Sequence, residues 1–92
     1  MNEFEFDPAK NKINKEKHGI DFVKAKELWQ RDRVIIPARK VSGESRFAIV
    51  GTIQNKHYVA IFTQRKDKIR IISCHPADKK WRKIYEKYVQ EF

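Results

Sequence analysis

The sequence contains one cysteine, Cys74, so an internal disulfide is impossible, and neither zinc-site spacing nor redox-pair spacing is present. Long apolar runs are also missing, since none approaches the roughly 18 residues of a membrane-spanning helix. The start of the chain, Met1 to Phe4, lacks the basic segment and the following apolar segment of an export signal. From these absences we expect a soluble, cytoplasmic protein that does not bind a membrane.

Acidic residues are scarce relative to basic ones. The chain carries 12 Asp and Glu against 21 Lys and Arg, a formal net charge of +9. This charge favours a polyanionic partner or an acidic protein over a neutral ligand, and RNA, DNA, anionic lipid and an acidic protein all fit it. Asp, Glu and His are not clustered at the spacing of metal ligands, so we expect neither a metal nor another cofactor.

The length of 92 residues allows one domain, residues 1–92, with one modest core. Its centre is predicted to be three consecutive strands, each with the two-residue period of a pleated strand. These strands are Arg46 to Ile53, His57 to Thr63 and Ile69 to Cys74, and polar turns at residues 54–56 and 64–68 join them. Both faces of the first two strands are largely apolar, so we expect them to lie inside the sheet.

Two helices are predicted before the sheet. Asp7 followed by Pro8 is typical of a helix start, and Gly19 suits the left-handed residue after a helix, so the first helix should run from about Pro8 to His18. Asp21 can cap a second helix, in which Phe22, Ala25, Leu28 and Trp29 form an apolar stripe. Phe4 to Phe6 is also compatible with a short edge strand.

The remaining elements flank the three strands. Arg33 to Pro37 is predicted as a strand, and Ala38 to Ser45 as a mobile polar loop. Pro76 should open a last helix, with Asp78 in its first turn and its aromatic residues on one side. The expected fold is therefore α+β: two N-terminal helices, a four-stranded, mainly antiparallel sheet and a C-terminal helix.

Four separated motifs occur in order along the chain. They are F-x-F-D-P-A-K-x-x-x-N-x-x-K-H-G-I-D-F at Phe4 to Phe22, G-E-x-R at Gly43 to Arg46, F-T-x-R at Phe62 to Arg65 and R-I-I-S at Arg70 to Ser73. Together they resemble the BrnT family, the toxins of bacterial type II toxin-antitoxin pairs. The resemblance implies a RelE-like fold and a ribonuclease that inhibits translation. It also implies a cognate BrnA-like antitoxin, held in a hetero-oligomer that binds DNA through the antitoxin. The family commonly continues R-I-I-S-A-R, whereas Cys74 and His75 follow Ser73 here, and an imidazole can transfer protons where an arginine only holds phosphate.

RNA cleavage without a metal needs a base, an acid and cations around the reacting phosphate. Arg46, Arg65 and Arg70 lie at or near the ends of neighbouring predicted strands and can converge on one phosphate, although each alone is equally compatible with a solvated surface arginine. His18 and His75 are the candidate base and acid. A cation at the end of a helix, or a turn residue, would explain these histidines equally well.

Further candidates would bind the RNA strand. They are Lys17, Arg39, Lys40 and Tyr58, whose ring can stack on an unpaired base. Glu44 can act as a base, but a salt bridge to a nearby cation is the commoner fate of such a carboxylate.

Two functions of different classes fit the sequence. The first is a metal-independent endoribonuclease toxin that cleaves RNA through its 2′-hydroxyl group and that an antitoxin neutralises. The second is a non-catalytic, basic module that binds nucleic acid or protein, such as a decayed toxin, which the replacement of the family arginine by His75 would favour.

Overall fold

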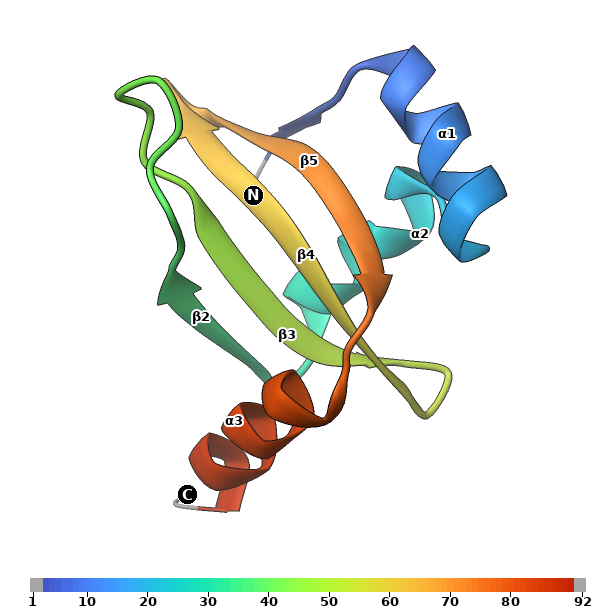
Figure 1. Ribbon diagram of the computed structural model, residues 1–92, viewed down its shortest axis with the longest axis vertical. Coiled ribbons are helices and arrows are strands. Elements are labelled where there is room, and N and C mark those ends of the chain that lie inside the picture. The colour runs from blue at the N-terminus through green and yellow to red at the C-terminus, as the bar shows by residue number, and fades with distance from the viewer. Residues whose placement is uncertain (1–2, 91–92) are drawn as a thin grey trace.

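The computed structural model describes residues 3–90. Its centre is a five-stranded sheet in the order β1-β5-β4-β3-β2 (Figure 1). The strands are β1 (Glu3–Glu5), β2 (Arg33–Pro37), β3 (Phe47–Ile53), β4 (Lys56–Arg65) and β5 (Lys68–Pro76). The helices are α1 (Pro8–His18), α2 (Phe22–Ala25), the 3-10 helix η1 (Lys26–Gln30) and α3 (Lys79–Gln90).

The expectation of four mainly antiparallel strands is wrong. The sheet is mixed, because β1 is a fifth strand that pairs in parallel with β5, with Phe4 opposite Ile69. The other three pairings are antiparallel. The partner of β1 lies more than sixty residues away in the sequence, so its pairing depends on where α1 delivers the chain, which the local pattern of three residues does not reveal.

The two N-terminal helices begin at the caps that the sequence predicts. Asp7 accepts a hydrogen bond from the Ala9 N–H at 2.8 Å, α1 ends at His18, and Gly19 is left-handed with φ 76°. Asp21 caps α2 through the Lys24 N–H at 2.8 Å. The α-helix then tightens into η1 after one turn, so the predicted apolar stripe of the second helix is spread over two short helices.

The last helix starts later than predicted. Pro76 is the final residue of β5, opposite Tyr58, and α3 begins at Lys79. Asp78 precedes the helix and caps it, since its carboxylate accepts a hydrogen bond from the Trp81 N–H at 3.1 Å. A proline ends a strand as readily as it starts a helix, because neither position needs its missing N–H.

The helices cover both faces of the sheet (Figure 1). On one face, which we call the α1 face, α1, α2 and η1 bury Phe22, Leu28, Ile49 and Ile71. On the other face, the α3 face, Trp81 and Tyr85 of α3 pack near Ala48, Val50 and Val59. No helix within residues 3–90 is long and apolar enough to cross a membrane.

β4 and β5 are longer than predicted, β3 starts one residue later than predicted, and the turns between these strands are tighter. β3 and β4 are joined at Gln54 and Asn55, both with positive φ (51° and 66°), as a type I′ hairpin requires. β4 extends to Arg65 and β5 starts at Lys68, so only two residues form that turn. The loop after β2 contains a small hairpin tip of its own, where the backbones of Val41 and Glu44 exchange two hydrogen bonds.

Candidate functional site

Two of the predicted arginines flank one residue of the central strand β4. Arg70 on β5 pairs directly with Thr63. Arg46 immediately precedes Phe47, whose partner is Phe62, so it lies beside Thr63 from the other side, and the Thr63 hydroxyl donates to the Ser45 carbonyl at 2.7 Å. Directly paired residues share a face of the sheet, so both arginines belong to the α3 face, beyond the end that α3 covers.

Two arginines are paired with carboxylates. Arg65, at the end of β4 and on the same face, donates from Nε to Glu44 at 3.0 Å. Arg70 donates to Glu5 at 2.9 Å, because the parallel pairing of β1 with β5 places these residues opposite each other. Glu44 therefore has the salt bridge that the sequence left open, while Glu5 had no sequence signal as a partner of Arg70.

Arg46 is different from the other two. Its Nε is buried and has no hydrogen-bond partner within the described part of the chain. Burying such a donor without an acceptor is costly, and an anion next to Arg46 would remove that cost. The cluster of Arg46, Arg65 and Arg70 thus contains one guanidinium that lacks an acceptor and two that carboxylates already neutralise.

The two candidate histidines meet at another point of the molecule. His18 ends α1 and His75 lies near the end of β5, and their ring centroids are 5.7 Å apart. Nδ1 of His75 lies 3.0 Å from the Pro76 carbonyl, which can only accept, so Nδ1 carries a proton. The neutral ring of His75 therefore keeps its lone pair on Nε2, where it can take a proton from a substrate.

The electrostatics of the pair favour one neutral ring. Partial burial lowers the pKa of His18 below its ordinary value, and the neighbouring His75 and Lys17 lower this pKa further. Two imidazoles so close cannot both be protonated cheaply. A neutral imidazole of the pair can serve as a base and, once protonated, as an acid.

Asn14 positions this pair and was not among the predicted site residues. It is buried, its Nδ2 donates to the carbonyls of Ile20 at 2.8 Å and Cys74 at 2.6 Å, and its Oδ1 accepts from the Cys74 N–H at 3.1 Å. Asn14 lies one turn before His18, and Cys74 directly precedes His75. The only sequence signal for Asn14 was its place in the N-terminal motif.

The histidine pair and the arginine cluster are separate. On β4, His75 pairs with Val59 and Arg70 pairs with Thr63, which is four residues further along the strand, or about 13 Å at ~3.3 Å per residue. His75 with Val59 and Arg70 with Thr63 lie on the same face of the sheet, the α3 face. An extended RNA strand can span this distance and contact both groups.

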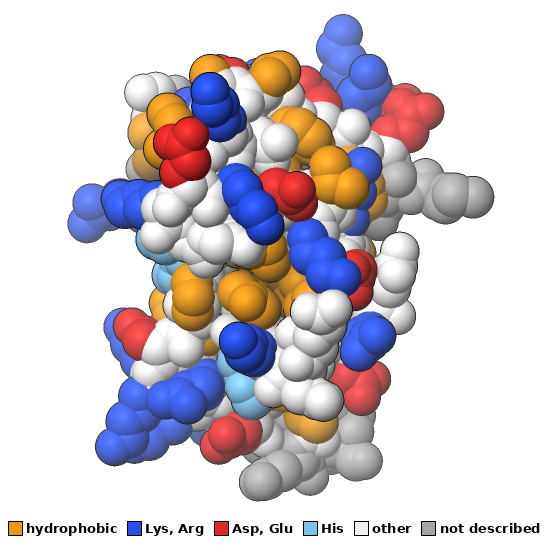
Figure 2. Space-filling model, turned by 90° about the vertical axis from the view of Figure 1, so that its right-hand side faces the viewer, with side chains coloured by type: hydrophobic (Ala, Val, Ile, Leu, Met, Phe, Trp, Pro, Cys, Tyr) orange, Lys and Arg blue, Asp and Glu red, His pale blue; other side chains and the backbone are white. Residues whose placement is uncertain are grey.

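The predicted RNA-binding residues do not form one group. Lys17 is exposed beside His18, and Arg39 and Lys40 are exposed in the loop between β2 and β3. Tyr58 is on the α1 face, where it packs against the core, so it lies on the side of the sheet away from the arginines. Figure 2 shows Lys and Arg side chains around an apolar patch, with a dense basic group at the lower left.

Within residues 3–90, three or more His, Cys, Asp or Glu side chains are nowhere arranged so that they could hold a metal ion.

Comparisons with known proteins were made with the whole chain. Residues 6–80 match the family model described as the ribonuclease toxin BrnT of type II toxin-antitoxin systems. The fold is similar to the crystal structure of the Brucella abortus ribonuclease toxin BrnT, with a TM-score of 0.71 and 21% identity, over 86% of this chain and 100% of that one. A search of curated protein sequences gave no match. The matched range includes the two candidate histidines, His18 and His75, and the three candidate arginines, Arg46, Arg65 and Arg70.

Proposed function

Because the chain belongs to the family of BrnT ribonuclease toxins of type II toxin-antitoxin systems, we propose that it is a metal-independent endoribonuclease. The ribose 2′-hydroxyl attacks the adjacent phosphorus, the bond to the 5′-oxygen of the next nucleotide breaks, and a 2′,3′-cyclic phosphate remains. Cleavage of cellular RNA in the cytoplasm by this route inhibits translation.

The observation that carries this proposal is the contact between His18 and His75. In-line attack needs a group that removes the 2′-hydroxyl proton and a group that protonates the leaving oxygen. Nε2 of His75 faces no protein partner among the hydrogen bonds of the described residues and is suited to the first step. His18 then protonates the leaving 5′-oxygen. The ammonium of Lys17 adds positive charge near the negative charge that builds up around the phosphorus during the attack.

The arginine cluster holds the strand at another phosphate. Arg46 offers a buried Nε that lacks an acceptor, and a phosphate oxygen supplies one. Arg70 is next to it across Thr63, and its salt bridge to Glu5 is partly exposed, so the guanidinium can still reach a second oxygen. This division of roles follows from the distance of about 13 Å between the two groups on β4.

Incubation of the purified protein with RNA in excess EDTA tests the proposal. We expect fragments that end in a 2′,3′-cyclic phosphate, and we expect that a substrate with 2′-deoxyribose at the cut site survives. Intact RNA at high protein concentration would exclude a ribonuclease. Cleavage that stops in EDTA would exclude the metal-independent route.

A non-catalytic RNA-binding module is the second candidate function, and one observation favours it. Arg65 and Arg70 already have carboxylate partners, which suits a binding surface more than a reactive site. This candidate predicts RNA binding that weakens steeply with salt, without strand scission. The EDTA experiment distinguishes the two, since only the enzyme yields fragments.

The proposed physiological partner is a cognate antitoxin. The family description names a type II system, in which the antitoxin is a protein. We propose that antitoxin and toxin form a hetero-oligomer that binds DNA through the antitoxin. The net charge of +9 suits an acidic binding segment in that partner.

A further inference from the structure

The outer edge of β2 is free to bind another strand. β2 pairs only with β3 in the described sheet, and it lies at the opposite edge from β1. The Ala38 N–H donates to the Arg46 carbonyl at 2.8 Å. Backbone groups alternate along an antiparallel strand, so the N–H and C=O groups of Val34 and Ile36 point toward β3, and those of Arg33 and Ile35 point outward. The backbone N–H and C=O groups of Arg33 and Ile35 thus form an unpaired edge, which ends at Pro37.

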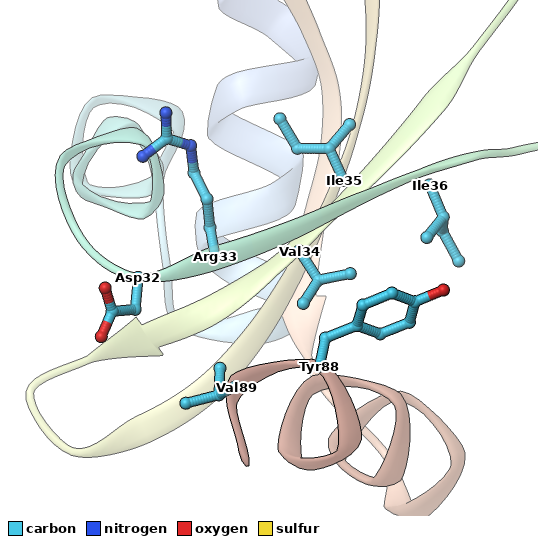
Figure 3. Close-up of a pocket in the computed structure, with 7 residues that line it drawn as sticks. All are labelled: Asp32, Arg33, Val34, Ile35, Ile36, Tyr88 and Val89. Carbon is cyan, nitrogen blue, oxygen red and sulfur yellow. The ribbon is translucent and has the colours of Figure 1, made fainter. Parts of the chain in front are cut away.

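A groove of about 470 Å³ runs beside this edge, between β2 and α3, and both apolar and polar residues line it. Figure 3 shows Val34 and Ile36 pointing from β2 toward Tyr88 of α3, while Arg33 and Ile35 point to the other side of the strand. Tyr88 and Ile35 are each 46% exposed, a large fraction for such side chains. An added strand would cover both of them.

The charge around the groove selects an acidic partner. The helix α3 carries five cationic residues and one acidic residue, namely Lys79, Lys80, Arg82, Lys83, Lys87 and Glu86. Arg31 precedes β2 and Arg33 opens it, with the acidic Asp32 between them at the groove, so cationic residues remain in excess. A second copy of this chain would bring another net charge of +9 against this surface, and RNA offers neither apolar side chains nor a peptide backbone for the strand edge.

The groove also leads toward the arginine cluster. Ile36 pairs with Ala48 and Pro37 pairs with Phe47, and Arg46 is the next residue along β3. Ile36, Ala48 and Arg46 lie on the same face of the sheet. A chain that follows the outer edge of β2 past Ile36 runs about two strand spacings, or ~10 Å, from β3, so its side chains can extend toward the guanidinium whose Nε lacks an acceptor.

We propose that the edge of β2 and the α3 groove together form the docking surface for the antitoxin, which rests on the proposed function. An extended, acidic segment of the antitoxin pairs with Arg33 and Ile35 as a sixth strand. Its apolar side chains fill the groove against Tyr88, and its carboxylates face the basic residues of α3. Its end reaches Arg46 and competes with RNA phosphate there.

The test uses the full-length chain and the protein encoded by the neighbouring reading frame. Tyr88→Asp places a negative charge in the groove, and Ile35→Pro removes one of the edge N–H groups. Ile13→Asp is the matched control, because Ile13 is 58% exposed on α1, away from the groove. We expect both test variants to bind the partner at least about tenfold more weakly, a loss of about 1.4 kcal/mol, and the control to bind like the unmodified chain.

Amide hydrogen exchange gives a second measurement that does not depend on the variants. In the complex, the amides of Arg33 and Ile35 should become protected, and they should exchange freely in the isolated chain. Equal affinity of all variants together with unprotected amides overturns the docking surface. Should Ile35→Pro fail to fold, Tyr88→Asp and the exchange data still decide.

Two other outcomes separate this inference from the proposed function. A neighbouring protein that does not bind the unmodified chain at all contradicts the proposed antitoxin partnership, while the RNA cleavage experiment still tests the nuclease. An isolated chain that is a dimer, and that Tyr88→Asp converts to a monomer, shows that a second copy occupies the groove and overturns the inference. Tyr88→Asp should cleave RNA at the unmodified rate.

Discussion

The side chain of Asn14 makes both hydrogen bonds that a neighbouring strand would make to Cys74. Its Oδ1 accepts the Cys74 N–H at 3.1 Å and its Nδ2 donates to the Cys74 carbonyl at 2.6 Å. β1 pairs with β5 only from Lys68 to Arg70, so the backbone of β5 lacks a strand partner on this side at Cys74. The amide of Asn14 supplies that partner from a helix and thereby fixes His18 relative to His75.

Replacement of Asn14 by leucine should destabilise the protein and impair cleavage. Leucine leaves the N–H and C=O of Cys74 buried and unpaired, at a cost of about 1–3 kcal/mol for each group. Urea denaturation measures this loss, with Lys12→Leu, an exposed position on α1, as the control. Equal unfolding free energies for the two variants would contradict the role of Asn14. If Asn14 positions the pair, the pH profile of cleavage by the folded variant should also change.

Replacement of Arg46 by alanine should weaken RNA binding more than it slows the chemical step. We expect KM to rise about tenfold or more, since one charge-assisted contact to phosphate is worth about 1.5–3 kcal/mol, while kcat changes little. His75→Ala should do the opposite and lower kcat by about a hundredfold or more. Steady-state kinetics on one short RNA distinguish the two effects, and Arg82→Ala on α3 is the control. A fall in kcat with unchanged KM for Arg46→Ala would place the scissile phosphate at the arginine cluster instead.

Stability should fall as the pH is lowered through the range in which His18 titrates. The folded protein lowers the pKa of His18 below the ordinary value of 6.5, mainly through burial, so the unfolded chain binds the proton more readily. The free energy of unfolding therefore carries the full contribution of His18 above the ordinary pKa. This contribution is lost as the pH falls from there toward the folded pKa.

Urea denaturation between about pH 5 and pH 8 measures this dependence. In His18→Gln the decrease toward acid pH should be smaller than in the unmodified chain, and Lys12→Gln should leave it unchanged. An identical pH dependence in His18→Gln would show that other groups cause it. Because His18 protonates the leaving oxygen in the proposed mechanism, its lowered pKa should make cleavage decline at a lower pH, as the pH rises, than an ordinary histidine would.

The thiol of Cys74 should be unreactive in the folded protein. It is fully buried, and burial raises its pKa to about 12, so almost no thiolate forms at neutral pH. Reaction with a thiol-specific disulfide reagent should be slow in buffer and fast in urea. A fast reaction in buffer would show that β5 opens locally next to His75. Such opening would also break the hydrogen bonds of Asn14, because its side chain holds the backbone of Cys74.

Local signals in the sequence predicted much of the fold. The caps Asp7 and Asp21 and the left-handed Gly19 lie next to the elements they terminate, so α1, the start of α2 and the strand β2 were predicted correctly. A short edge strand was considered at Phe4 to Phe6, where β1 lies at Glu3–Glu5, but its parallel pairing with β5 was not predicted, because its partner is distant in the sequence. Pro76 misled the helix prediction, because the same residue suits the end of a strand.

The candidate site was predictable as residue types but not as an arrangement. The sequence pointed to the histidines and arginines individually and placed the arginines at or near the ends of neighbouring strands. The register across Thr63 and the 5.7 Å contact of His18 with His75 depend on pairings between distant segments. The sequence led to the expectation that Arg46, Arg65 and Arg70 converge on one phosphate, which stays a prediction. The position of the histidine pair, four residues away along β4, could not be predicted.

The sequence by itself determined the excess of positive charge, the helix caps and the apolar alternation of the strands, because each depends on residues within a few positions of one another. Only the tertiary structure decided which charges have partners. In the tertiary structure Arg70 pairs with Glu5 and Arg65 pairs with Glu44. The Nε of Arg46 has no acceptor within residues 3–90, and the hydrogen bonds of Asn14 hold His18 near His75. The reason is physical: a buried polar group must find its partner in space, and that partner is seldom its neighbour in the chain.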